Sequence, residues 1–242
     1  MTKRLGVEPK PKPKPKAKAK SKAKSKAKSK VKPKAQTKVK PEAVLRRTQA
    51  QRRRQTQKAI LQATMTVLIQ DGYEKFTTTR VARTAGVSRG AQENYFRTKN
   101  ELIVAATHYA LTRAVAHART LAKRSPGSSD PIDKFLADSK SFFFSPTFQA
   151  LAEIIAVARR NSDLAKINTP VVRKFREIIN GIWIDALCEA GYERASVDAF
   201  IKTTHYILRG MALASLYQPR GIELPKMLDA CRRIAMRELK RV

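Results

Sequence analysis

The stretch TTTRVARTAGVSRG at residues 77–90 carries the signals of two short helices joined by a tight turn. One threonine of the run 77–79 is expected to cap the first helix and Ser88 the second, because their side-chain oxygens accept from free backbone N–H groups. Ala82 is small where the two helices would cross, and Gly86 tolerates the backbone of a sharp turn. A helix, a short turn with a glycine and a second helix form the helix-turn-helix layout.

Sequence with helical periodicity lies on both sides of this stretch. Before it, apolar residues at helical spacing predict a helix from about Arg52, which Asp71-Gly72 ends. The second helix of the motif is predicted over residues 89–96, and Thr98 caps a longer helix that runs to about Lys123. The N-terminal half therefore predicts a three-helix domain that contains a helix-turn-helix.

The C-terminal half also predicts helices. The run SPGSSDP at residues 125–131 marks a break. Helices are expected over residues 131–144, 146–160, 163–189, 196–217 and 223–241. Pro170 falls inside the third of these and is expected to kink or split it, and Gly191 and Gly221 mark helix ends. The alternation typical of strands is absent, so the predicted fold class is all-α.

The positive charge of the chain is concentrated towards its N-terminus. The formal net charge is +32, of which residues 1–42 carry +15, residues 43–124 carry +12 and residues 125–242 carry +5. Lysine occupies every second position from Lys10 to Lys34, between Pro, Ala and Ser, so this tail has little to bury and is predicted to be disordered. Such a gradient favours a polyanionic partner, with nucleic acid first and an anionic membrane surface second.

The second helix of the motif is expected to present its N-terminal residues to the major groove of double-stranded DNA. Arg89 can pair with guanine or a phosphate, and Asn94 can bond an adenine edge. Gly90 allows close approach to the DNA, and Lys99 lies at a helix N-terminus, where anions such as phosphate are favoured. The competing interpretation is a solvated basic surface in which the Ala-x3-Gly spacing arises by chance.

Residues 52–112 resemble the N-terminal domain of the TetR (tetracycline repressor-like) transcriptional regulators. The stretches that carry the resemblance are Ala59-Ile60-Leu61-x-Ala63, Asp71-Gly72-Tyr73, the run from Thr77 to Gly90, and Tyr95-Phe96-Arg97-Thr98-Lys99-x-Glu101-Leu102. The resemblance adds the start of the motif's first helix, together with Tyr95 and Lys99, to the DNA-facing surface. The residues predicted to bind DNA are then Thr78, Thr79, Arg80, Arg89, Gly90, Ala91, Gln92, Asn94, Tyr95 and Lys99.

Two residues depart from the family pattern. Gln92 stands where an apolar residue normally faces inward, so it is either half-buried and hydrogen-bonded or turned towards the bases. Glu93 replaces an aromatic residue that commonly touches phosphate, and its carboxylate would repel phosphate. We expect Glu93 to pair with Arg97 at i+4, or else to accept a hydrogen bond from a cytosine amine.

For the C-terminal half, the resemblance implies dimerisation and a small-molecule effector. In TetR relatives the last two long helices form a dimeric four-helix bundle, and the small residues of 209–216 fit a close helix–helix approach, although packing within one monomer is the alternative. A two-fold homodimer would read a palindromic operator. The candidate residues lining an effector cavity are Phe135, Phe142, Phe143, Trp183, His205 and Tyr206, each of which could instead be plain core.

No enzyme is indicated, and no cofactor or metal site is predicted. The three histidines, His108, His117 and His205, show no metal-ligating spacing, and the sequence contains neither a nucleophile elbow nor a phosphate-binding loop. Cys188 and Cys231 are expected to be small core residues in a reducing compartment. No stretch approaches the ~18 consecutive apolar residues of a membrane span, and the N-terminus lacks the apolar run of a secretion signal. The predicted location is cytoplasmic and nucleoid-associated, with no membrane partner.

These observations predict a disordered Lys/Pro/Ala-rich tail over residues 1–42, a TetR-type DNA-binding domain over 52–112, and a helical effector-binding and dimerisation domain over 113–242. The function they favour is a sequence-specific DNA-binding transcriptional regulator, a repressor that a small-molecule effector releases. The alternative is a nucleoid-associated, histone-like protein in which the basic tail dominates binding. An adaptor for a membrane surface or an acidic partner would leave the helix-turn-helix unexplained.

Overall fold

The described part of the chain, in a computed structural model, comprises residues 48–123, 130–217 and 223–242. The predicted basic tail and Gly221 lie outside the described residues. Within them, regular secondary structure is helical, with one isolated antiparallel bridge between Tyr192 and Arg241. The all-α prediction is confirmed.

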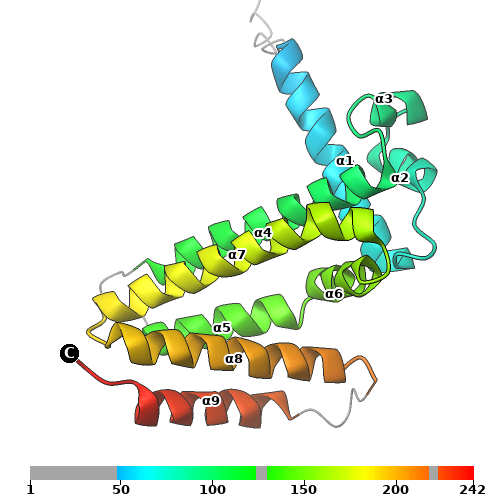
Figure 1. The fold of residues 1–242 in the computed structure, drawn as a ribbon. Coiled ribbons are helices and arrows are strands. Elements are labelled where there is room, and N and C mark those ends of the chain that lie inside the picture. Colours follow the sequence, from blue (N-terminus) through cyan, green and yellow to red (C-terminus); the bar gives the residue numbers. More distant parts are fainter. Residues whose placement is uncertain (1–47, 124–129, 218–222) are drawn as a thin grey trace, which may run out of the picture. The chain divides into compact units, whose positions relative to one another are not determined.

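The described helices are α1 Gln49–Asp71, α2 Thr78–Ala85, α3 Arg89–Glu93, α4 Lys99–Ala122, α5 Pro131–Phe143, α6 Pro146–Ala158, α7 Ser162–Glu189, α8 Arg194–Ala214 and α9 Leu224–Glu238. The long helices α4 and α7 lie side by side, and α5 packs against both of them and against α8 and α9 (Figure 1). The short helix α2 packs against α1, and α3 packs against α2, with the helix-turn-helix at the end of α4 that begins with Lys99 (Figure 1).

The N-terminal helices begin and end at the capping residues that the sequence indicates. Thr48 and Gln51 form a capping box that starts α1 slightly earlier than predicted, and Gly72, at φ 72°, ends it by donating its N–H to the Leu68 carbonyl. The Thr77 side chain caps α2, and Gly86 ends that helix in the left-handed region at φ 68°. These local signals place the two helices of the motif before any long-range packing is considered.

The helix-turn-helix does not have a core of its own. Its buried side chains, among them Ile60, Phe76 and Phe96, belong to one apolar cluster with Leu151 and Ile154 of α6. A second cluster, centred on Phe135 and Trp183, joins α5, α7, α8 and α9. Because α6 shares a core with α1 to α4, it cannot shift without disturbing the motif's packing.

The bounds of several helices differ from the predicted ones by up to three residues, as in α8 and α9, and two of the differences have an identifiable cause. The second helix of the motif ends at Glu93 rather than near Phe96, because the Gln92 carbonyl accepts from the backbone N–H groups of both Tyr95 and Phe96 at 3.0 Å. Of the kink or split predicted at Pro170, the split is wrong, because helix α7 is assigned without a break from Ser162 to Glu189; the proline is exposed, and the helix packs against α4.

No single helix in the described ranges is long and apolar enough to cross a membrane. Only α5 and α6 taken together would have the length and composition, and they are bent by 61° relative to each other.

Candidate nucleic-acid interface and effector cavity

The N-terminus of α3 is capped and open to solvent. The Ser88 Oγ accepts a hydrogen bond from the Ala91 N–H at 3.1 Å, which fixes the start of the helix. Arg89, Gly90 and Asn94 are exposed, and Ala91 is half-buried. A Cβ built on Gly90 would meet no atom within 4 Å, so the space through which DNA could approach this position is free.

The start of α2 contributes a second exposed edge. The Thr77 Oγ1 accepts from the Arg80 N–H at 3.2 Å, Thr79 is exposed and Thr78 is half-buried. The Arg80 guanidinium pairs with Asp71 at the end of α1, with Nη2 3.0 Å from Oδ1. This ion pair orients Arg80 between the two helices.

The two departures from the family pattern have clear structural outcomes. Gln92 is fully buried, and its Nε2 donates to the Phe96 carbonyl at 3.1 Å, so it adopts the inward, hydrogen-bonded alternative and leaves the DNA-facing set. Glu93 accepts from Nε of Arg89 at 2.7 Å, so its partner lies four residues before it. The expected partner, Arg97, instead begins the turn into α4, and its N–H donates to Glu101.

Lys99 and Tyr95 occupy less exposed positions than the other members of the predicted set. Tyr95 is half-buried against the core of the motif. The Lys99 ammonium donates to the Tyr73 carbonyl at 3.3 Å and lies 4.2 Å from the centre of the Tyr73 ring. Burial lowers the pKa of Lys99. Lys99 thereby fastens the start of α4 to the loop that follows α1, with its charge close to the predicted DNA face.

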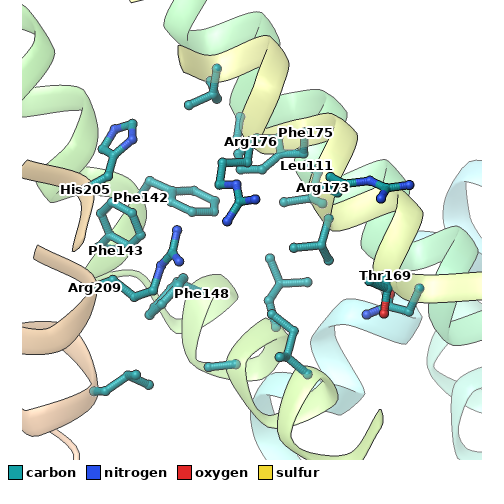
Figure 2. Close-up of a pocket in the computed structure, with 18 of the residues that line it drawn as sticks. Leu111, Phe142, Phe143, Phe148, Thr169, Arg173, Phe175, Arg176, His205 and Arg209 are labelled. Carbon is teal, nitrogen blue, oxygen red and sulfur yellow. The ribbon is translucent and has the colours of Figure 1, made fainter. Parts of the chain in front are cut away.

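A cavity of about 700 Å³ lies between α4, α5, α6, α7 and α8. Its walls are mostly apolar, and Figure 2 shows the rings of Phe142, Phe143 and Phe148 gathered on one side of it. The Phe142 and Phe148 rings are 5.8 Å apart, and the Phe143 and Phe148 rings 5.1 Å, both edge to face. A volume of this size accommodates a drug-sized small molecule.

Half of the six predicted effector-contacting residues line this cavity, namely Phe142, Phe143 and His205. Phe135 and Trp183 pack edge to face in the neighbouring core at a centroid distance of 5.7 Å, which is the plain-core alternative. Tyr206 is 60% exposed and lies on the outer face of α8.

Sequence reasoning missed several lining residues, chiefly Arg176 and Arg209. One signal could have found Arg176. Val172, Phe175, Arg176 and Ile179 recur at the spacing of a single helix face, so an arginine stands within an apolar stripe of α7.

Two buried titratable residues line the cavity where α5 meets α8, namely Asp138 of α5 and His205 of α8. The His205 ring nitrogens lie 3.2 Å from Ser139 Oγ and 3.1 Å from Asn180 Oδ1, and burial, with a smaller contribution from the Arg209 charge, lowers the pKa of His205 to about 4. Burial also raises the pKa of Asp138, against the opposing effect of the Trp183 Nε1–H, which donates to its carboxylate at 2.9 Å. His205 is therefore neutral at pH 7.

A hydrogen bond joins α6 to the loop beside the helix-turn-helix. Oε1 of Glu153 accepts from the Tyr73 N–H at 2.8 Å. A Cβ on Gly72 would come within 3.0 Å of the same oxygen, so glycine permits this close approach. Neighbouring residues of α6, including Ala152 and Ile155, line the cavity. One helix therefore contacts both the cavity and the loop that leads into the motif.

Known proteins share both the motif and the whole helical fold. Residues 60–106 match the family model described as bacterial regulatory proteins, tetR family. The HTH-type transcriptional regulator CymR of Pseudomonas putida is 33% identical over 174 residues, which cover 72% of this chain and 85% of that protein. The chain belongs to the TetR family. It is a DNA-binding transcriptional regulator, and nothing in these likenesses favours the nucleoid-associated alternative.

Solved structures of TetR regulators share this fold at low sequence identity. A TetR transcription regulator from Haloarcula marismortui superposes with a TM-score of 0.60 at 20% identity, covering 76% of this chain and 98% of that one. A transcriptional regulator from Rhodococcus sp. Rha1 gives a TM-score of 0.57 at 20% identity, covering 77% of this chain and 98% of that one. TetR regulators usually act as dimers that respond to small-molecule effectors.

Replacing Arg89 by Ala is expected to weaken binding to a preferred DNA sequence by about 1–3 kcal/mol, because an exposed guanidinium at the start of α3 is lost from the groove. The loss on random-sequence duplex is expected to be smaller. Titration of a fluorescent duplex measures both affinities. Arg119→Ala, which removes an exposed charge from α4, is the matched control. Equal losses on the preferred and random sequences would contradict a role of Arg89 in reading bases.

The depressed pKa of His205 makes the stability of the protein fall in acid. The unfolded chain takes up this proton near pH 6.5, whereas the folded protein resists it down to about pH 4. The free energy of unfolding should therefore decrease by about 1.4 kcal/mol per pH unit as the pH falls through this window. Chemical denaturation of the wild type and of His205→Gln at several pH values checks this.

Asp138 is present in both proteins, so the difference between their two stability curves isolates His205. The expected result is a steeper fall for the wild type below pH 6.5. Parallel curves would show that His205 takes up its proton without resistance in the folded protein.

Proposed function

We propose that this regulator is a homodimeric repressor that binds a two-fold symmetric operator and is released when a small molecule occupies the cavity. The observation that carries this proposal is the double contact of α6. Its residues line the cavity, while Glu153 of the same helix accepts from the Tyr73 N–H beside the helix-turn-helix. A ligand that repositions α6 would thereby favour a state whose DNA-reading helices are wrongly placed for the operator.

The proposed DNA face consists of the exposed residues at the starts of α2 and α3, together with Asn94, which follows the last residue of α3. Thr79, Arg89, Gly90 and Asn94 are open to solvent, and Arg80 is held beside them by Asp71. Arginine at the N-terminus of a recognition helix suits guanine, and asparagine suits adenine. We propose that four half-buried residues contact the sugar-phosphate backbone of the DNA, namely Thr78, Ala91, Tyr95 and Lys99.

The proposed dimer interface lies on α8 and α9. Four exposed residues follow one another at helical spacing along one face of α8 and the turn after it, namely Tyr206, Gly210, Leu213 and Tyr217. A Cβ on Gly210 would meet no atom within 4 Å, so this small residue has no neighbouring helix in its own protomer. Helix α9 adds exposed apolar side chains such as Met236. Such a surface fits burial against a second copy of the chain.

The domain boundaries are proposed as the sequence indicates, at residues 1–42, 52–112 and 113–242. The boundary after residue 112 falls inside α4, so the DNA-binding and effector domains share this helix. The basic tail is proposed to add sequence-independent attraction to the phosphate backbone and to keep the regulator on the nucleoid.

Selection of duplexes from a random-sequence pool by the full chain tests the proposal. At moderately raised salt, which weakens the tail's attraction to phosphate, the recovered sequences should contain two copies of a short motif related by a two-fold axis. The centres of the half-sites should lie about one helical turn, or a multiple of it, apart. A single asymmetric half-site would contradict the dimer, and no enrichment at all would contradict sequence reading.

A further inference from the structure

Among the described residues, the lining of the cavity carries more positively than negatively charged side chains. Its lining includes Arg159, Arg173, Arg176 and Arg209 but only one carboxylate, that of Asp138. Asp138 is engaged elsewhere, since its oxygens lie 2.9 Å from Trp183 Nε1 and 3.9 Å from His117 Nε2. Within the described residues, none of these arginines has a carboxylate at ion-pair distance.

Two of the arginines converge on the centre of the cavity. Figure 2 shows the guanidinium groups of Arg176 and Arg209 pointing towards one another across it, whereas the Arg173 side chain points away. The Arg209 guanidinium carbon lies 5.7 Å from the centre of the Phe143 ring and 5.6 Å from that of Tyr206. Burial, and after it the nearby Arg176 charge, lower the pKa of Arg209.

The repulsion between these two guanidinium groups is unfavourable unless an anion lies between them. Two like charges face each other: Arg209 is half-buried and partly stripped of water, whereas Arg176 stays exposed to solvent. A cationic ligand would add to the repulsion, and a neutral apolar ligand would desolvate the guanidinium groups without pairing them. A carboxylate between the two arginines would instead accept charge-assisted hydrogen bonds from both, in the fork geometry that guanidinium groups favour.

The rest of the cavity fits an apolar body attached to such a group. Phe142, Phe148 and Phe175 surround the arginines with aromatic surface. Another polar lining residue, Asn168, is only 2% exposed, and within the described residues its Oδ1 has no hydrogen-bond partner. A buried unpaired carbonyl oxygen is costly, so it marks a second point at which a ligand can bind, by donating a hydrogen bond.

We propose that the effector is an aromatic carboxylic acid, whose carboxylate binds between Arg176 and Arg209 and whose ring packs among the phenylalanines. This inference rests on the effector role proposed above for the cavity. One negative charge suits the site better than two, because Asp138 also lines the cavity and would repel a second anionic group.

A charge series on one aromatic body tests the proposal with the DNA-free full chain. The probes are 2-naphthoate, 2-naphthamide and 2-naphthylmethylammonium, which share a ring system and differ in charge. Isothermal calorimetry and thermal unfolding should show that the acid binds and raises the melting temperature. The amide should bind at least tenfold more weakly, and the ammonium compound should not bind measurably.

Substitutions locate the carboxylate. Arg176→Gln and Arg209→Gln are each expected to weaken binding of 2-naphthoate at least tenfold. Lys174→Gln, which removes an exposed cation outside the cavity from the same helix as Arg176, should leave the affinity unchanged. Without ligand, Arg209→Gln should melt at the same temperature as the wild type or higher, because it removes a partly desolvated charge.

Three results would overturn the proposal. They are equal affinity for 2-naphthoate and 2-naphthamide, no binding of 2-naphthoate at millimolar concentration, and an affinity for 2-naphthoate that Arg176→Gln and Arg209→Gln leave unchanged. A large drop in the melting temperature of unliganded Arg209→Gln would assign that arginine to structure instead. If 2-naphthoate binds the protein but does not release it from DNA, only the proposed release mechanism is contradicted. The ligand proposal stands in that case, because binding of 2-naphthoate is measured without DNA.

Discussion

The sharing of α6 between two parts of the molecule is the constraint on which the regulator depends. Leu151 and Ala158 belong to the apolar cluster that contains the helix-turn-helix and also line the cavity. Since packed interiors move in discrete rearrangements rather than by smooth deformation, a change on the cavity side has to be accommodated on the other side. The Glu153–Tyr73 hydrogen bond adds a polar connection at the point where the chain leaves α1. This shared packing is the physical basis of the proposed linkage between ligand binding and the presentation of α3.

The cavity is built at some cost to stability. Asn168 leaves a buried oxygen unpaired, and the half-buried Arg209 has no carboxylate partner among the described residues. Each of these features opposes folding of the unliganded protein, whereas a simple apolar core would avoid them. Sites that are strained in the free protein in this way gain the most when a ligand supplies the missing partner.

The local signals of the sequence were sufficient for the helix-turn-helix. Thr77, Ser88 and Gly86 act within a few residues of themselves, and the structure confirms all three as caps or turn residues. The end of α3 was predicted wrongly because it depends on Gln92, whose backbone carbonyl accepts from the N–H groups of Tyr95 and Phe96 while its side chain turns into the core. A sequence pattern offers both outcomes for such a residue, and packing decides between them.

The cavity was harder to predict, because residues from five helices form it. Phe135 and Phe142 are two turns apart on the same side of α5, yet only Phe142 reaches the cavity, while Phe135 packs against Trp183. The two arginines were missed for a related reason. A long cationic side chain normally reaches solvent, and only the helices that pack around Arg209 reveal that its charge is partly enclosed.

The proposed linkage between cavity occupancy and operator binding is tested most directly by a large side chain that is introduced on α6 and fills the cavity in place of a ligand. Ala152 lines the cavity, whereas Gln149 of the same helix is exposed outside it. If α6 transmits occupancy, Ala152→Trp should bind the selected operator about tenfold more weakly than the wild type, a typical coupling of ~1.4 kcal/mol. It should do so while keeping its helical content and oligomeric state, and Gln149→Trp should bind normally. A folded Ala152→Trp protein with wild-type operator affinity would contradict the account.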